Sequence, residues 1–203
     1  MSLTILGRAG SINVRKVLWT CVELGLAFAR EERDWRSPDY LALNPNGMMP
    51  VLLDGEFVLW ESNTICRYLA GREGRSDLLP SAPRERALVE RWMDWQLSDL
   101  NNSWRYAFMG LVRQSPAHQD PSQQRASVES WNRHMALLDA QLQGTGAYVA
   151  GGQFTLADIV IGLSAHRWRA APIDKPELPA VEAYYRRLAS RPGFLTHGRD
   201  AGP

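Results

Sequence analysis

Neither a dominant charge, nor a cysteine framework, nor a long hydrophobic run marks this sequence of 203 residues. Its 23 Lys and Arg residues nearly balance its 22 Asp and Glu residues, so the overall charge does not suggest a nucleic-acid partner. No apolar run approaches the ~20 residues that cross a bilayer, and the first ten residues lack the basic and apolar regions of a secretory signal. We therefore expect a cytoplasmic protein that binds neither nucleic acid nor membrane.

The two cysteines, Cys21 and Cys66, show neither CxxC spacing nor the spacing of metal ligands. Both lie in apolar patterns of helical period, which favours small buried side chains in a reducing compartment. Because Cys21 falls well inside its predicted helix, it is poorly placed as a redox nucleophile. We therefore expect no metal site and no reaction through a protein thiol.

The first eighty residues alternate between strand and helix patterns. The predicted elements are a strand at 3–6, a helix with apolar residues from Val14 to Leu24, a strand at 28–33, an irregular or helical segment, strands at 51–53 and 57–60 around an Asp54-Gly55 turn, and a helix beginning near Thr64. An early β-α-β unit followed by a hairpin and a helix predicts a mixed sheet with helices on its faces.

After a linker rich in turn residues, the pattern becomes entirely helical. Helices are predicted at 84–113, at 123–142, after the Thr155–Asp158 capping arrangement and at 179–190. The sequence therefore predicts a small α/β module followed by an all-α module.

The passage from Asn44 to Leu69 combines several signals in a short space. Pro50 directly precedes a predicted strand, where proline marks an edge, a bulge or a cis peptide. The returning strand runs straight into Glu61, Ser62 and Asn63, which are polar residues at a helix start. The two features predict a small cleft rich in hydrogen-bond donors, which suits an anionic group.

Three segments in this order resemble the cytosolic glutathione transferase superfamily. NPNGMMPVL at 44–52 resembles the family's cis-proline segment, ESNTICRYL at 61–69 its γ-glutamyl-binding segment, and FTLADIVIG at 154–162 its helix capping box. GRAGSINV at 7–14 is similar to the first turn of bacterial members that carry Ser-x-Asn there. The resemblance implies a thioredoxin-like domain with a four-stranded mixed sheet at 1–75, a linker at 76–83 and a helical domain at 84–203.

The same resemblance implies how glutathione would be held. The backbone of Met49, before a cis Pro50, would pair with the cysteinyl group, while Glu61 and Ser62 would hold the γ-glutamyl amine and carboxylate. Many relatives carry a lysine for the glycyl carboxylate where this chain has Met48. Arg36, Asn46 or a group from a second subunit would replace this lysine at the glycyl carboxylate. A purely structural alternative is that Pro50 terminates a strand and that Ser62 caps a helix.

A glutathione transferase must ionise a thiol that otherwise titrates near pH ~8.5. A hydroxyl or amide donor at a helix N-terminus stabilises the thiolate. Ser11 lies where the first strand gives way to the first helix, and Asn13 follows two residues later. Both residue types are also favoured helix caps, so the residues alone leave capping and catalysis open. The resemblance favours Ser11 as the catalytic donor, with Asn13 second.

The second substrate is expected between the two modules. Trp104 would give the site an apolar wall, together with Tyr106, Phe108 and Met109, and Arg8 and Arg113 would face the cleft. The arginines lead to the hypothesis of an anionic electrophile such as a halogenated carboxylic acid. For any single arginine the alternative is a solvated surface position.

The resemblance implies a transferase of alkyl or aryl groups, with glutathione as co-substrate and a role in detoxification. The second hypothesis for the function is a glutathione-dependent isomerase, dehalogenase or disulfide reductase on the same fold. The third is a non-catalytic binding module. A homodimer is expected through the Trp-rich face of the helix from Arg84, unless its apolar residues all serve the intrachain core.

Overall fold

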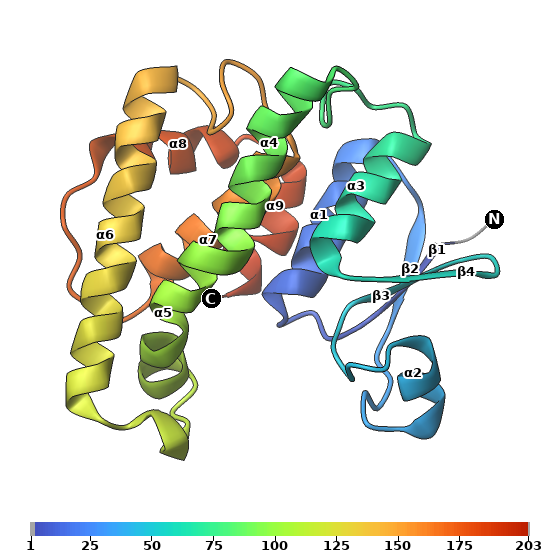
Figure 1. The fold of residues 1–203 in the computed structure, drawn as a ribbon, viewed down its shortest axis with the longest axis horizontal. Coiled ribbons are helices and arrows are strands. Elements are labelled where there is room, and N and C mark those ends of the chain that lie inside the picture. The colour runs from blue at the N-terminus through green and yellow to red at the C-terminus, as the bar shows by residue number, and fades with distance from the viewer. Residues whose placement is uncertain (1–2, 203) are drawn as a thin grey trace.

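A computed structural model describes residues 3–202 of the chain. The outer ends of the two predicted domains, residues 1, 2 and 203, lie outside the described residues. A sheet-containing N-terminal region lies beside a helical C-terminal region (Figure 1). Within the described part, no helix combines the length and the apolar character needed to cross a membrane.

The sheet has four strands in the order β2-β1-β3-β4. The elements of this region are β1 (Leu3–Leu6), α1 (Ile12–Leu24), β2 (Phe28–Glu31), α2 (Pro38–Leu43), β3 (Val51–Asp54), β4 (Phe57–Trp60) and α3 (Ser62–Arg72). β1 runs parallel to β2 and antiparallel to β3, and β3 runs antiparallel to β4. Helices α1 and α3 lie against one another, whereas Tyr40 of α2 packs with Leu6 and Val51 in a small separate core. The predicted mixed four-stranded sheet is confirmed.

Three predicted boundaries shift. β2 ends at Glu31 rather than 33, because its partner β1 ends at Leu6, with which Glu31 pairs. The hairpin turn consists of Gly55 and Glu56 rather than Asp54 and Gly55, since Asp54 still pairs with Phe57. Gly55 takes φ +62°, as the first residue of such a turn requires.

α3 begins at Ser62 rather than near Thr64, and Glu61 precedes it as the N-cap residue. The Asp54 carboxylate accepts hydrogen bonds from the Tyr68 hydroxyl (2.8 Å) and the Arg72 guanidinium (2.6 Å). These bonds tie the end of β3 to the body of α3.

The C-terminal region is built from two long helical rods and shorter helices around them. Its elements are α4 (Pro83–Trp95), the π-helical η1 (Gln96–Leu100), α5 (Asn101–Ala107), the π-helical η2 (Phe108–Val112), a 3-10 turn η3 (Pro116–His118), α6 (Pro121–Thr145), α7 (Leu156–Ala170), α8 (Pro179–Leu188), α9 (Pro192–His197) and a 3-10 turn η4 (Arg199–Ala201). The predicted helix at 84–113 is thus one continuous rod with two π-helical stretches. α6 starts earlier than predicted because the Asp120 carboxylate caps it through the N–H groups of Ser122 and Gln123.

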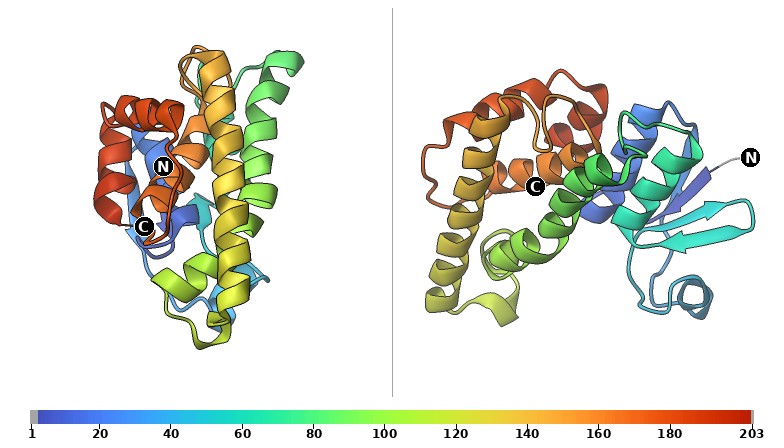
Figure 2. Two further views of the ribbon diagram at one scale, coloured as in Figure 1. Left: turned by 90° about the vertical axis from the view of Figure 1, so that its left-hand side faces the viewer. Right: turned by 45° about the horizontal axis from the view of Figure 1, so that its top comes forward.

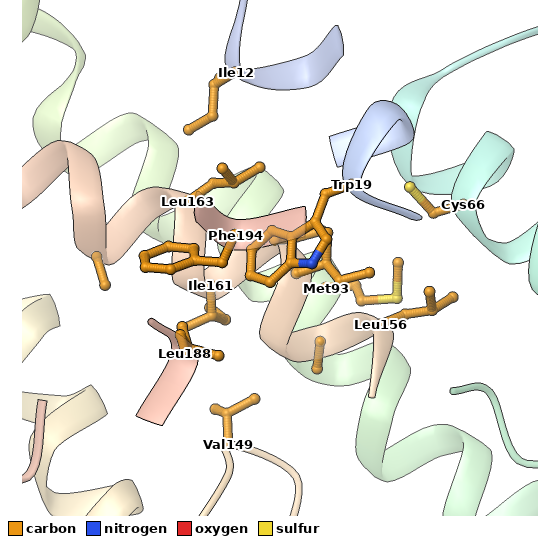
Figure 3. Close-up of a cluster of buried hydrophobic side chains, with 14 of the residues drawn as sticks. Ile12, Trp19, Cys66, Met93, Val149, Leu156, Ile161, Leu163, Leu188 and Phe194 are labelled. Carbon is orange, nitrogen blue, oxygen red and sulfur yellow. The ribbon is translucent and has the colours of Figure 1, made fainter. Parts of the chain in front are cut away.

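The two regions share one hydrophobic core. Helices α7 and α9 contact α1 and lie between it and α6 in Figure 1 and in the right-hand view of Figure 2. Trp19 of α1 is fully buried, and its ring centroid lies 5.2 Å from that of Phe194 in α9 (Figure 3). Gly162 and Gly193 leave room for this indole, because a Cβ at Gly193 would lie 2.3 Å from it. The position of α1 is therefore set by the helical region as well as by the sheet.

The predicted capping arrangement before α7 is present. The Thr155 N–H and hydroxyl both donate to Asp158 Oδ2, at 2.8 and 3.2 Å. Asp158 Oδ1 accepts from the Val149 N–H at 2.9 Å and the Tyr184 hydroxyl at 3.0 Å. Burial raises the pKa of this carboxyl to about 6, against the effect of the four bonds. Asp158 thereby joins α7, α8 and the segment after α6.

Candidate active site

Ser11 and Asn13 sit at the N-terminus of α1, and each has a polar side-chain atom without a hydrogen-bond partner among the described residues. Ser11 is the N-cap residue by backbone conformation, with φ −84° and ψ 122°, but its side chain makes no capping hydrogen bond. Asn13 Oδ1 is buried and has no hydrogen-bond partner among residues 3–202. Of the two sequence-based readings of Ser11, side-chain capping is therefore not realised. An unused hydroxyl at a helix N-terminus is well suited to hold an anion.

Arg15 shapes the loop that carries Ser11. Its Nε donates to the Ala9 carbonyl at 3.1 Å and its Nη2 to the Gly10 carbonyl at 3.3 Å. Its Nη1 donates to the carbonyl of Gly202 near the C-terminus. The side chain is only 3% exposed. The loop after β1 is thus held from both α1 and the C-terminal end of the chain.

The Met49-Pro50 peptide bond is cis, as the family resemblance implies. The preceding carbonyl, that of Met48, accepts hydrogen bonds from the Tyr40 hydroxyl (2.9 Å) and the Asn44 amide (2.8 Å). In the described chain, no protein group bonds the backbone N–H or carbonyl of Met49. The backbone of Met49 therefore remains open to pair with an extended peptide.

Glu61 and Ser62 lie next to this segment through the strand register. Val51 pairs with Trp60, so Pro50 and Glu61 are adjacent at the same end of the β3–β4 ladder. Glu61 has φ +74°, an uncommon value for a residue other than glycine. Ser62 is 3% exposed, and its hydroxyl has no partner within the described part of the chain. The first turn of α3 thus presents free N–H groups and a hydroxyl beside Met49.

The surroundings of Arg36 and Asn46 differ, which bears on the lysine missing at Met48. The Met48 side chain is 61% exposed. Asn46 donates its side-chain amide to Asn44 Oδ1, which leaves this amide committed to its own turn. Arg36 is exposed, its guanidinium lies 4.3 Å from the centre of the Trp35 ring, and it pairs with no carboxylate of residues 3–202.

On the helical side, two arginines lie on an aromatic surface. The Arg167 guanidinium of α7 lies 4.7 Å from the Trp104 ring centre and 4.2 Å from that of Phe108. The Arg113 guanidinium lies 5.4 Å from the Phe108 ring. Burial, with Arg15 and Arg113 nearby, lowers the pKa of Arg167 to about 9. Neither Arg113 nor Arg167 has a carboxylate partner in the described chain.

The remaining candidates from the sequence have different surroundings. Arg8 is exposed in the loop after β1, and no described side chain pairs with it. The Tyr106 hydroxyl accepts a hydrogen bond from the Asp120 N–H, and its ring lies 5.0 Å from that of His118, so Tyr106 faces the start of α6. Sequence reasoning did not identify Arg167, because a basic residue in the last turn of a helix is common and gives no separate signal.

A groove of about 690 Å³ lies elsewhere on the helical region. It is lined by Leu111, Pro121, Gln124, Arg125, Val128, Glu129, Asn132, Pro172, Ile173 and Asp174. None of the predicted site residues is among them. The lining of this groove therefore includes neither the N-termini of α1 and α3 nor the cis-proline segment.

Comparisons with known proteins agree with this arrangement. Residues 10–72 match the family model for the N-terminal domain of glutathione S-transferases, and residues 120–187 match the model for the C-terminal domain. The chain is 38% identical to glutathione S-transferase GstB of Escherichia coli K12 over 197 residues, which cover 94% of each protein.

Solved structures show the same relationship. The theta class glutathione S-transferase of Xanthomonas axonopodis pv. citri with glutathione bound is 42% identical, with a TM-score of 0.90 over 97% of this chain and 96% of that one. A delta-class glutathione transferase of Nilaparvata lugens is 26% identical, with a TM-score of 0.87 over 98% and 94% of the two chains. The chain belongs to the glutathione S-transferase family. The predicted thioredoxin-like domain followed by a helical domain is confirmed.

Proposed function

We propose that this glutathione S-transferase holds glutathione along the Met49-Pro50 segment and the first turn of α3. The observation that supports this is the convergence of unused polar groups: the Ser62 hydroxyl, the Met49 backbone and, at α1, the Ser11 hydroxyl. Glu61 takes the γ-glutamyl ammonium and Ser62 its carboxylate. Ser11, supported by Asn13, donates to the thiolate, which attacks a small electrophile.

Retention on glutathione-agarose followed by a substrate panel tests this function. An active conjugating enzyme is expected to be retained and to turn over aromatic and alkyl halides. Retention with only isomerase, dehalogenase or disulfide reductase activity would favour the second reading of the sequence. Loss of both retention and activity would favour a non-catalytic module.

The electrophile that fits the helical side is an anion. Arg113 and Arg167 form a cationic pair on the Trp104 and Phe108 rings, with no carboxylate counter-ion among residues 3–202. Arg167 is 5% exposed whereas Arg113 is exposed, and because buried charges in proteins are normally paired, a ligand carboxylate is the natural partner of Arg167. With a halogenated carboxylic acid, the carboxylate binds this pair while the thiolate sulfur forms a bond to carbon. The carbon–halogen bond breaks, and the halide leaves with its electrons.

Replacing Arg167 by Met is expected to lower kcat/KM for bromoacetate about tenfold to a hundredfold, because a charge-assisted hydrogen bond is lost. Arg113→Ala and Arg8→Ala are measured alongside it. Turnover of neutral bromoacetamide reports damage to the site in general and is expected to change less than about threefold. Arg169→Ala, on the same helix and paired with Glu182, is the matched control. Equal effects on both substrates, or none in any variant, would exclude the anion site.

A cation restored at position 48 is expected to strengthen glutathione binding. Met48→Lys places an ammonium on an exposed side chain beside the proposed glycyl carboxylate, and the KM for glutathione should fall about threefold. Arg36→Ala should raise this KM by a similar factor if Arg36 serves that carboxylate. Steady-state kinetics with varied glutathione measure both. A higher KM for Met48→Lys would show that the glycyl end lies elsewhere.

We also propose a cytoplasmic homodimer that acts in detoxification. The exposed apolar residues that favour a partner surface are Phe57 and Trp60 on the edge strand β4, Leu88 on α4 and Leu97 on η1. Trp104 of the expected Trp-rich face is instead 8% exposed and belongs to the intrachain core. The cytoplasmic location and the domain limits at 75 and 84 stay predictions.

A further inference from the structure

A lysine is buried at the junction of the two regions, behind the first turn of α3. Lys16 of α1 has no exposed surface, and it is one of only two lysines in the chain, against 21 arginines. Its Nζ donates to Gln96 Oε1 at 2.7 Å and to Asn63 Oδ1 at 3.2 Å. Both partners are neutral amides. Burying a cation without a bonded carboxylate is costly, so its presence calls for a function.

The amides that receive Lys16 are themselves fixed by further hydrogen bonds. The Asn63 amide nitrogen donates to the Met93 carbonyl at 2.9 Å. The Gln96 amide nitrogen donates to Asn101 Oδ1 and to the Ser164 hydroxyl, each at 3.0 Å. Because the amide nitrogens of Asn63 and Gln96 already donate hydrogen bonds, their oxygens are oriented toward the ammonium of Lys16. The network therefore crosses from α1 and α3 to α4, α5 and α7.

The charges around Lys16 leave it without a strong counter-ion. Burial is the largest influence and lowers the pKa of its ammonium to about 8. Cys66 and Glu61 act to raise this pKa, whereas Arg167 and Arg67 act to lower it. Glu61 is the one carboxylate among these groups, and its side chain is exposed. A positive potential thus remains beneath the turn of α3, added to that of the helix N-terminus.

We propose that Lys16 is a positioning residue of the γ-glutamyl subsite: it holds Asn63 in place and provides the positive potential under the turn that receives the γ-glutamyl carboxylate at Ser62. This inference rests on the proposed binding of glutathione at that turn. Arginine, used elsewhere in the chain, is bulkier and keeps its proton, whereas lysine fits between two amides and can titrate.

Ligand binding and the protonation of Lys16 must then be coupled. A bound carboxylate favours the charged ammonium, so binding raises its affinity for a proton. Near pH 8 about half of the free protein carries this proton, and binding should take up as much as about half a proton. At pH 6.5 Lys16 is already protonated, and its share of the uptake should vanish.

Isothermal titration calorimetry with S-methylglutathione in two buffers of different ionisation enthalpy measures this uptake. The methyl group removes the thiol, whose ionisation would otherwise release protons. We expect uptake that peaks near pH 8 in the wild-type protein and is lost in Lys16→Met and Lys16→Arg. Lys175→Met is the matched control, because within the described part of the chain Lys175 donates only to the Ala171 and Ile173 carbonyls. Its uptake should equal that of the wild type.

Kinetics separate positioning from a general structural role. Lys16→Met should raise the KM for glutathione about tenfold, with kcat changed less than about threefold, because Asn63 loses a charge-assisted bond.

Binding of S-methylglutathione without a Lys16-dependent proton uptake would overturn the inference and leave the proposed function intact. Absence of binding to the wild type would overturn the proposed function itself. If Lys16→Met does not fold, a flat wild-type uptake between pH 6.5 and 8 is sufficient to reject the inference.

Discussion

Replacing Ser11 by Ala is expected to lower kcat/KM for conjugation of 1-chloro-2,4-dinitrobenzene about a hundredfold, the effect of removing one donor from a developing anion. The reason lies in the unused hydroxyl at the start of α1, which makes no capping bond. Loss of the Ser11 hydroxyl should raise the pKa of the bound glutathione thiol. A pH titration followed by the ultraviolet absorbance of the thiolate measures this pKa.

The same variant distinguishes catalysis from capping. A capping serine replaced by alanine costs about 1 kcal/mol of stability, whereas Ser11→Ala should leave the free energy of unfolding nearly unchanged. Asn13→Ala is the paired variant, since Asn13 lies in the same first turn of α1 and its side-chain amide N–H can donate to a thiolate. A larger rise of the thiol pKa in Asn13→Ala than in Ser11→Ala would exchange the two roles. A stability loss in Ser11→Ala with unchanged thiol pKa would make Ser11 a cap.

Replacing Asp158 by Ala is expected to lower the free energy of unfolding by about 3 to 5 kcal/mol. The carboxylate accepts four hydrogen bonds in a fully buried site, from Val149, Tyr184 and both donors of Thr155. Its removal leaves the donors of Val149 and Thr155 without this acceptor, and leaves the Tyr184 hydroxyl with only the Asp158 carbonyl, at 3.3 Å. Urea unfolding followed by circular dichroism measures the loss.

Two further variants locate the origin of that loss. Thr155→Ala removes only the hydroxyl side of the capping box and should cost about 1 kcal/mol. Asp158→Asn keeps the shape but turns an amide N–H toward one pair of donors, so its cost should fall between the other two. A loss below about 1 kcal/mol in Asp158→Ala would show that water satisfies these donors.

Local patterns were sufficient where a short segment decides its own structure. The capping box at Thr155 and the cis-proline segment before β3 were identifiable because each is encoded within a few residues. The hairpin turn was misplaced by one residue because the Asp54 side chain is held by Tyr68 and Arg72, far along the chain. The short α9 escaped prediction because its six residues show little apolar periodicity.

The residues proposed to bind glutathione could all be named from the sequence, whereas those proposed on the helical side could be named only in part. The relation of Met49 to Glu61 follows from one hairpin, whose presence the sequence indicates although its turn lies one residue later than predicted. The roles of Arg167 and Lys16 depend on which helices meet, and both residues read as ordinary members of amphipathic helices. Whether Ser11 caps or donates depends on a side-chain rotamer that no sequence pattern encodes.

The burial of Trp19 against Phe194 has a consequence for how the chain denatures. An indole from the sheet region completes the interior of the helical region, so neither region can lose its structure without exposing apolar surface of the other. Unfolding should therefore be a single cooperative transition in which tryptophan fluorescence and circular dichroism change together. A fragment ending at the linker would carry Trp19 into water and should not persist as an independent folding unit.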